Sequence, residues 1–227
     1  MQKYKFTGET KEVYGRTLHQ IVCVTAFASV AAGEVGGYIE KEVNLSQDGN
    51  AWVSGNAKVS GDAKVFGDAE VFGNAKVCGN AKVCGDAKVC GNAKVCGNAK
   101  VFGDANVSGD AKVFGNAKVF GDAWVFGDAE VCGDAEVFGN AILRRGSTET
   151  ATDYIVIGPQ GSRRSFATLH LPSNTVCTGC FVGNLNEFKK AVYKNHNPDQ
   201  GRVTFNNQYQ RVIRVFEFLQ EQDKDAQ

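Results

Sequence analysis

Cysteines are the first residues of this chain that could do chemistry, because thiolates bind soft metals and thiol pairs form disulfides. The sequence has eight of them. Four recur six residues apart in the stretch CGNAKVCGDAKVCGNAKVCGNAKV, namely Cys78, Cys84, Cys90 and Cys96. A metal site requires that such thiols converge on one point, and a disulfide requires that two of them meet. Their role therefore depends on the element that carries them.

Two further sets of residues could take part in metal or redox chemistry. The motif CTGC separates Cys177 and Cys180 as in redox motifs and in half of a zinc site. A second cysteine pair is missing, and the motif lies in an expected strand rather than at a helix start, so we expect buried or incidental thiols. The three histidines, His19, His170 and His196, lie outside the repeat described below, and His170 and His196 have no evident carboxylate partner and are expected to be structural or exposed.

The segment GPQGSRR is a glycine-rich turn that follows an expected strand. Backbone amides and guanidinium groups together hold phosphates or carboxylates. The alternative interpretation is a hairpin loop with solvated arginines. We retain Gly161, Ser162, Arg163 and Arg164 as a candidate contact for a ligand or a partner, with Arg163 as the first choice.

The spaced cysteines belong to a larger pattern, a six-residue unit that runs without insertion over residues 49–144. Its consensus is Gly, Asn or Asp, Ala, a variable residue, Val, and then Phe, Ser or Cys. Ala and Val two residues apart indicate a short strand, and Gly followed by Asn or Asp suits a tight turn. Short strands joined by tight turns predict a parallel solenoid of stacked coils.

The repeat resembles the hexapeptide repeats of left-handed parallel β-helix proteins of the bacterial and phage type, in which three hexads form one triangular coil. This resemblance implies a mainly β fold in which sixteen hexads form about five coils. The passage GGYIE to NLSQDGNAWV resembles the N-terminal cap of that group, so residues 1–48 are expected to cap the first coil. Related hexapeptide proteins often trimerise, which implies a homo-oligomer with a trimer favoured.

With three hexads per coil, residues 18 apart stack into columns. The spaced cysteines then fall on three different corners and cannot bind one metal. Only Cys78 and Cys96 stack, one coil apart, at a spacing that permits a disulfide. Because nothing in the sequence indicates export, we expect reduced thiols and no metal or other cofactor.

Charged residues also sort into columns. Two faces carry lysines, and one corner carries Asp68, Asp86, Asp104 and Asp122. Lysine columns could bind a polyanion, or they could solubilise a strand-rich surface. The repeat carries nine lysines against eleven acidic residues, which favours the solvated interpretation. Ordinary turn chemistry explains the aspartates better than a calcium row does.

The residues that follow the valines sort into three columns. One of them is rich in phenylalanine and consists of Phe66, Cys84, Phe102, Phe120 and Phe138. If the column is exposed, it is an apolar stripe that requires a partner. We therefore predict that the oligomer forms through Phe66, Phe102, Phe120 and Phe138.

Residues 145–227 lack the repeat and are expected to form a small α+β domain with strands before two helices. Asn184 and Glu187 predict a capping box at the start of the first helix. The pieces IGPQGSRRSFAT and GCFVGNLNEFKKAV resemble a small domain of phage and prophage proteins. That resemblance implies a role in an infected host, against a defence system for example.

An acyltransferase of the β-helix type is disfavoured, because no histidine and no loop insertion interrupts residues 49–143. The zinc-dependent carbonic anhydrase variant needs histidine ligands and is excluded on the same ground. Charge is balanced, with 25 basic and 25 acidic residues, and no apolar run is long enough to span a bilayer. We expect a cytoplasmic protein without a membrane or nucleic-acid partner.

The sequence thus favours a non-enzymatic scaffold that oligomerises through the β-helix and recognises a partner, an unknown host protein, with its C-terminal domain. The alternative is a protein that sequesters an anionic, nucleotide-like small molecule. Acyl transfer ranks below both.

Overall fold

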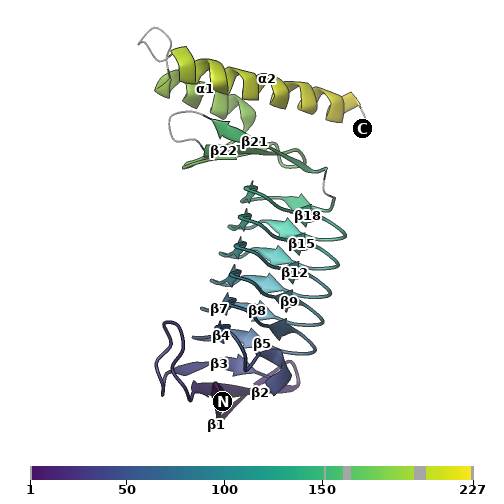
Figure 1. The fold of residues 1–227 in the computed structure, drawn as a ribbon. Coiled ribbons are helices and arrows are strands. Elements are labelled where there is room, and N and C mark those ends of the chain that lie inside the picture. Colours follow the sequence, from purple (N-terminus) through teal and green to yellow (C-terminus); the bar gives the residue numbers. More distant parts are fainter. Residues whose placement is uncertain (1, 151, 161–164, 197–202, 226–227) are drawn as a thin grey trace.

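The computed structural model describes residues 2–150, 152–160, 165–196 and 203–225. It consists of a parallel β-solenoid with antiparallel strands at its N-terminal end and a small α+β region with two helices at the other end (Figure 1). The expected fold class is confirmed: mainly β, a parallel solenoid, an N-terminal β region and a C-terminal α+β region.

Each hexad contributes one strand of two residues, formed by the variable residue and the valine. The strands of the first turns are β4 (Trp52–Val53), β5 (Lys58–Val59), β6 (Lys64–Val65), β7 (Glu70–Val71), β8 (Lys76–Val77), β9 (Lys82–Val83), β10 (Lys88–Val89) and β11 (Lys94–Val95). Those of the later turns are β12 (Lys100–Val101), β13 (Asn106–Val107), β14 (Lys112–Val113), β15 (Lys118–Val119), β16 (Trp124–Val125), β17 (Glu130–Val131), β18 (Glu136–Val137) and β19 (Ile142–Leu143). Every third strand joins the same sheet, so three parallel sheets form the walls.

The register confirms the predicted columns. Lys94 pairs with Lys76 on one side and with Lys112 on the other, 18 residues away in each direction. The valines and alanines of the repeat point inward and are completely or almost completely buried. The glycines of the turns have positive φ angles, for example +66° at Gly91, and they stack so closely that a Cβ atom there would lie 2.9 Å from the Gly109 nitrogen. Glycine is thus required at these positions both by conformation and by space.

The solenoid extends beyond the hexads at both ends. Upstream, β3 (Val35–Ile39) pairs with β5 in parallel, and Leu45, after the 3-10 helix η1 (Glu42–Asn44), bridges to Val65. Downstream, beyond the last hexad, β20 (Ser147–Thr148) pairs with β17 in parallel. Paired residues of β17 and β20 are one residue closer in sequence than those of the hexads, since Val131 faces Thr148 rather than residue 149. The wall therefore continues where the consensus has already decayed.

The N-terminal strands β1 (Tyr4–Val13) and β2 (Arg16–Cys23) form a hairpin that continues antiparallel to β3. Polar side chains from this region satisfy backbone carbonyls of the first turns. Lys3 Nζ donates to Ala51 O at 2.9 Å, Tyr4 OH to Leu45 O at 2.7 Å, and Asn44 Nδ2 to Ala63 O at 2.8 Å. The open end of the solenoid is thereby covered, as a stack of short strands requires.

The C-terminal region is a four-stranded antiparallel sheet with two helices on one side. Its elements are β21 (Tyr154–Gln160), β22 (Ser165–His170), β23 (Thr175–Thr178), β24 (Phe181–Gly183), α1 (Leu185–Asn195) and α2 (Val203–Asp225). The predicted capping box is confirmed, with Glu187 N donating to Asn184 Oδ1 at 2.9 Å and Asn184 N donating to Glu187 Oε2 at 2.8 Å. Within the described residues, neither helix has the length and apolar character that a membrane span needs.

Candidate functional site

The C-terminal sheet has two faces with different tasks, because successive side chains of a strand point to opposite sides. In β22, Thr168 and His170 point toward the last turn of the solenoid, where Thr168 Oγ1 accepts a hydrogen bond from Ile142 N at 3.0 Å. From β21, Tyr154 OH donates to Glu136 O and accepts from Phe138 N, each at 3.1 Å. This face therefore closes the C-terminal end of the solenoid.

His170 is a structural residue, as the sequence analysis expected. It is buried, with Nδ1 2.6 Å from Ser173 Oγ and Nε2 3.0 Å from Thr148 Oγ1. Burial lowers its pKa below the ordinary value of 6.5, so the ring is neutral at physiological pH. Both ring nitrogens are occupied by these contacts, and the ring faces the solenoid rather than a cavity.

The opposite face of the sheet packs against the helices and borders a cavity of about 380 Å³. Ala167 and Val176 on this face belong to the core shared with both helices, and Thr178 follows Val176 two residues later on the same side. The side chains and backbone that line the cavity come from β22, β23, β24, the turn between them and the helices. They are Ser165, Thr178, Gly179, Cys180, Phe181, Phe188, Ala191, Val192, Asn195, His196 and Tyr209.

Thr178 is the unusual member of this lining. Only 8% of the residue is exposed, and its hydroxyl has no hydrogen-bond partner within the described chain. An unsatisfied buried polar group costs about 1–3 kcal/mol, and such groups are rare enough to require an explanation. A ligand or water in the cavity would supply the missing partner.

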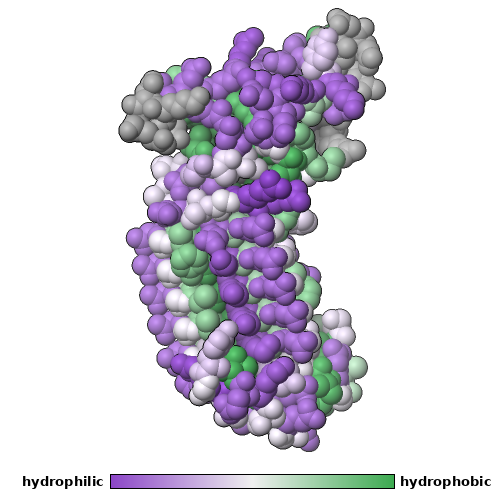
Figure 2. All heavy atoms as spheres, turned by 180° about the vertical axis from the view of Figure 1, so that it is seen from behind, coloured by the Kyte–Doolittle hydropathy of each residue, from purple (hydrophilic) through white to green (hydrophobic). Residues whose placement is uncertain are grey.

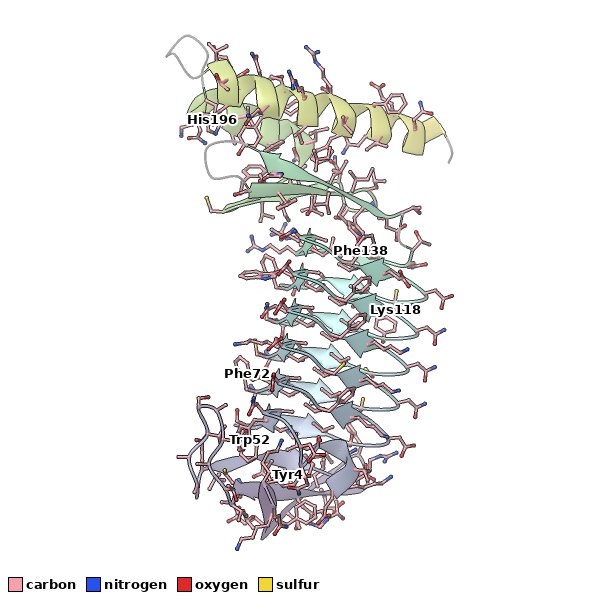
Figure 3. All side chains as sticks on the ribbon, viewed as in Figure 1. Tyr4, Trp52, Phe72, Lys118, Phe138 and His196 are labelled. Atoms are coloured by element: carbon pink, nitrogen blue, oxygen red, sulfur yellow. The ribbon has the colours of Figure 1, made fainter. Side chains whose placement is uncertain are left out.

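Aromatic rings form much of the cavity wall. The Phe181 and Phe188 rings lie 5.4 Å apart between centroids, Phe188 and Tyr209 lie 5.9 Å apart, and His196 and Tyr209 lie 5.0 Å apart. Figure 3 shows His196 where α1 ends, on the helix side of the sheet. Among the described lining residues, none is Asp, Glu, Lys or Arg. The described part of the lining is thus aromatic, weakly polar and without fixed charge.

The predicted contact at Gly161, Ser162, Arg163 and Arg164 lies outside the described residues, so it stays a prediction. Ser165, which follows Arg164 directly in the chain, lines the cavity. The cavity itself was missed by the sequence analysis. Two sequence features could have pointed to it. The run TVCT indicates a buried strand, and Asn195 and His196 form a polar end of the first helix.

The cysteines of CTGC do not converge. Cys177 is 2% exposed on the solenoid side of the sheet, where burial raises its pKa to about 11. Cys180 is exposed in the turn after β23 and lines the cavity. No group of three or more potential ligands that could hold a metal occurs in the part of the chain that the structure describes.

The phenylalanine column lies on the outside of the solenoid. The Phe102 and Phe120 rings stack with centroids 4.9 Å apart and an interplanar angle of 1°, and Phe138 continues the stack at 5.4 Å. Phe138, at the end of the stack, remains 47% exposed. Phe66 is 39% exposed, and Cys84 separates it from Phe102 in the column. Figure 2 shows hydrophobic side chains gathered in bands along the solenoid, between hydrophilic rows. We call Phe102, Phe120 and Phe138 the phenylalanine ladder.

The polar columns of the solenoid are explained by contacts between neighbouring turns. Asn80, Asn98 and Asn116 donate in sequence from Nδ2 to the next side-chain oxygen, at 3.0, 3.0 and 2.9 Å. The series ends at Asp134, whose carboxylate only accepts. The lysine columns end in ion pairs with glutamates, such as Lys112 with Glu130 at 2.5 Å. The ion pairs support the solvated, structural interpretation of the lysine columns.

The predicted stacking of Cys78 on Cys96 is confirmed, since they follow the paired valines Val77 and Val95. The remaining spaced cysteines, Cys84 and Cys90, follow strands of the other two sheets. The interaction between the two thiols lowers the pKa of Cys78 to about 7 and raises that of Cys96. None of the described cysteines is joined to another by a disulfide.

A second cavity, of about 550 Å³, lies between the loop around Ala28 to Glu34 and the solenoid face that carries Trp52, Glu70 and Lys88. Trp52 lines it, and its buried Nε1 has no partner among the described residues. The Trp52 ring is held edge-on by Tyr4 and Phe27, at 6.5 and 5.6 Å between centroids. Asp68 and Asp86 in its lining belong to the aspartate column, which continues with Asp104 and Asp122 outside the cavity. These carboxylates therefore do not distinguish the cavity from the rest of the corner.

Comparisons of the sequence with protein-family models and with curated proteins give no match. The expectation of a hexapeptide-repeat protein of phage type therefore rests on the sequence motifs themselves, and function has to be argued from the site.

Proposed function

We propose that this protein is a non-enzymatic scaffold that oligomerises side by side through the outside of the solenoid and presents its C-terminal domain to a partner. The observation that carries the proposal is the phenylalanine ladder. Three stacked rings on the outer surface, ending in Phe138 at 47% exposure, form an apolar stripe along a rigid wall. Stripes of this kind mark interaction surfaces.

The closed ends of the solenoid favour lateral association. The N-terminal hairpin covers the first turns, and β22 and β23 lie against β19 at the other end. Open strand ends are the usual route to end-to-end stacking, and here the N-terminal hairpin and the C-terminal sheet cover the two ends of the solenoid. The ladder offers a continuous apolar contact along the side of the solenoid. A trimer is the favoured assembly, because three copies can bring their ladders together around one axis.

The C-terminal domain is held firmly enough to serve as a display element. Tyr154, Thr168 and His170 hydrogen-bond to the last turns of the solenoid, so the helices keep a fixed orientation relative to the ladder. The proposed partner is a host protein of an infected cell, in line with the phage-like motifs, and the proposed location is the cytoplasm.

The test is the oligomeric state measured by analytical ultracentrifugation. The double variant Phe102→Lys/Phe120→Lys should lower the mass to that of the monomer, because it places charges in the apolar contact. Phe72→Lys/Phe126→Lys is the matched control, since it changes two phenylalanines of another column. A wild type that is monomeric at all concentrations would overturn the proposal.

A second candidate is capture of an anionic, nucleotide-like ligand by the C-terminal domain. It is favoured by the aromatic cavity, which Ser165 lines directly after the pair Arg163 and Arg164 in the chain. A thermal-shift screen with nucleotides and cyclic dinucleotides tests it, because a ligand that binds only the folded state stabilises that state. The stabilisation should be lost in Arg163→Ala. Stabilisation by coenzyme A instead would support the acyltransferase alternative.

A further inference from the structure

We infer that the cavity between the C-terminal sheet and helix α1 is a binding site for an uncharged planar heteroaromatic ring, of the nucleobase class, that hydrogen-bonds to the hydroxyl of Thr178. This inference rests on the ligand-capture candidate and deepens it, because it names the part of the ligand that is buried and the residue that recognises it. It does not depend on oligomerisation.

The first argument is that the described part of the lining carries no fixed charge. No Asp, Glu, Lys or Arg occurs among the described residues that line the cavity. A buried ionised group needs a partner of opposite charge or several hydrogen bonds, and this lining offers few such groups. The buried part of the ligand is therefore neutral, and any phosphate of a nucleotide must stay outside the cavity.

The second argument is the shape and chemistry of the walls. Phe181, Phe188 and Tyr209 supply ring faces and edges, and the His196 ring lies 5.0 Å from that of Tyr209 at an angle of 31°. Flat rings pack against such walls by stacking or by edge-to-face contacts. The volume of about 380 Å³ lies within the usual range for small-molecule sites, near its lower end.

The third argument is the unsatisfied hydroxyl. Thr178 is buried and faces the helix side of the sheet, and it has no hydrogen-bond partner in the described chain. A hydroxyl both donates and accepts, so it can pair with a ring nitrogen, an exocyclic amine or a carbonyl of a base. An aliphatic ligand would leave this group unpaired. The combination of aromatic walls with one buried hydroxyl thus selects a ring that carries polar edge atoms.

Other candidate ligands fit less well. The described residues offer no cluster that could hold a metal ion. The exposed members of the lining, Cys180 and Asn195, lie at the surface and provide the entry side of the cavity. Asn195 carries both a donor and an acceptor, so it can contact the ring edge or the sugar.

The experiment is titration of the purified full chain with adenosine, guanosine, cytidine and uridine, followed by calorimetry and by amide chemical shifts. Nucleosides carry no phosphate, so they test the cavity separately from the arginines. We expect at least one nucleoside to bind and to shift the amides of Thr178, Ala191 and Val192. If none of the four binds the wild type, the inference is overturned, whatever the oligomer test shows.

Three variants sharpen the test. Thr178→Val keeps the shape of the side chain and removes the hydroxyl, so binding should weaken by about 3- to 10-fold, which corresponds to one hydrogen bond. Thr175→Val is the matched control on the same strand, because Thr175 bonds to Ser173 and does not line the cavity. Its affinity should stay within about twofold of the wild type. Ala191→Phe should fill the cavity and abolish binding.

The variants also show where a bound nucleoside lies. Equal affinity in wild type, Thr178→Val and Ala191→Phe would place any observed binding elsewhere and overturn the inference. Because Thr178→Val removes an unsatisfied group, it should fold at least as stably as the wild type, so loss of binding cannot be ascribed to misfolding. A nucleotide without a measurable effect, beside a nucleoside that binds, would overturn the arginine contact and leave the cavity site standing, so the two failures are distinguishable.

Discussion

Thr148 and His170 meet where the core of the solenoid ends, with 3.0 Å between Thr148 Oγ1 and His170 Nε2. Thr148 occupies the inward position that valine holds in the preceding turns, because it pairs with Val131 of β17. It is buried, so its hydroxyl requires a partner, and the C-terminal sheet supplies one. This contact couples the last turn of the repeat to the domain that covers it.

Removal of His170 should therefore destabilise the protein beyond the loss of one side chain. In His170→Leu the Thr148 hydroxyl is left buried without its partner, which should lower the free energy of unfolding by about 1–3 kcal/mol. The double variant Thr148→Val/His170→Leu should recover part of that loss, since both polar groups are gone. Urea unfolding followed by circular dichroism measures the coupling, and strictly additive effects would contradict it.

The same histidine predicts a loss of stability in mild acid. Its folded pKa lies below the unfolded value of 6.5, so the unfolded chain binds more protons as the pH falls below 6.5. Stability from this group is complete above pH 6.5 and declines as the pH falls toward its lowered folded pKa. The slope of unfolding free energy against pH should be steeper in the wild type than in His170→Leu. Equal slopes would show that His170 is not buried in its neutral form.

Lys3 should make the stability depend on pH in the alkaline range. Its amine is buried at the first turn, where desolvation lowers its pKa from 10.5 to about 8, although Asp48, Cys23 and Asp68 partly oppose this. Between about pH 8 and 10 the unfolded state holds the extra proton, so stability from this group rises with pH. Above pH 10 the raised pKa of Tyr4 acts against the rise.

The comparison that isolates this effect is wild type against Lys3→Met. The variant should be less stable at pH 7, because Ala51 O loses its hydrogen bond from the amine at 2.9 Å. The gap between the two proteins should widen from pH 8 to 10, as measured by thermal unfolding. A constant gap over that range would contradict the lowered pKa of Lys3.

The regular part of the fold was predictable because it repeats. Alternation within each hexad fixes which side chain points inward, and the length of 18 residues per turn fixes which residues stack, so Lys76, Lys94 and Lys112 fall in one column as expected. The ends were harder, since Ile39 and Thr148 complete the walls without the consensus. There, tertiary contacts replace the repeat signal.

The cavity was not predictable for a related reason. Its lining combines Thr178 from a strand, Ala191 from α1 and Tyr209 from α2, residues that no local pattern relates. The sequence placed the candidate ligand contact at the preceding arginines because those are visible as a motif. Whether a buried threonine finds a partner depends on how two helices sit on a sheet, and spacing alone does not contain that information.

Cys78 should be the most reactive of the four spaced cysteines. Its interaction with the Cys96 thiol lowers its pKa to about 7, whereas burial raises the pKa of Cys84 and of Cys90. Thiolates react with alkylating agents and thiols do not, so iodoacetamide at pH 7 should modify Cys78 first. Peptide mass spectrometry over a time course gives the order. In Cys96→Ala this interaction is lost and the rate at Cys78 should fall, and an unchanged rate would contradict the coupling of the two thiols.

The stacked turns predict that one glycine is far less replaceable than another of similar conformation. Gly91 and Gly139 have φ angles of +66° and +63°, so alanine strains the backbone similarly at both. At Gly91 the new Cβ would also lie 2.9 Å from the nitrogen and 3.0 Å from the oxygen of Gly109, whereas at Gly139 no described atom lies within 4 Å.

Gly139→Ala should therefore cost only the left-handed strain, about 1–2 kcal/mol. Gly91→Ala should cost clearly more, because the backbone of the next turn must move and the turns on either side are packed against it. Chemical denaturation of both variants under identical conditions gives the difference. Equal losses would show that the turns have room to separate, and that the spacing between coils is set by the strands rather than by the glycine corners.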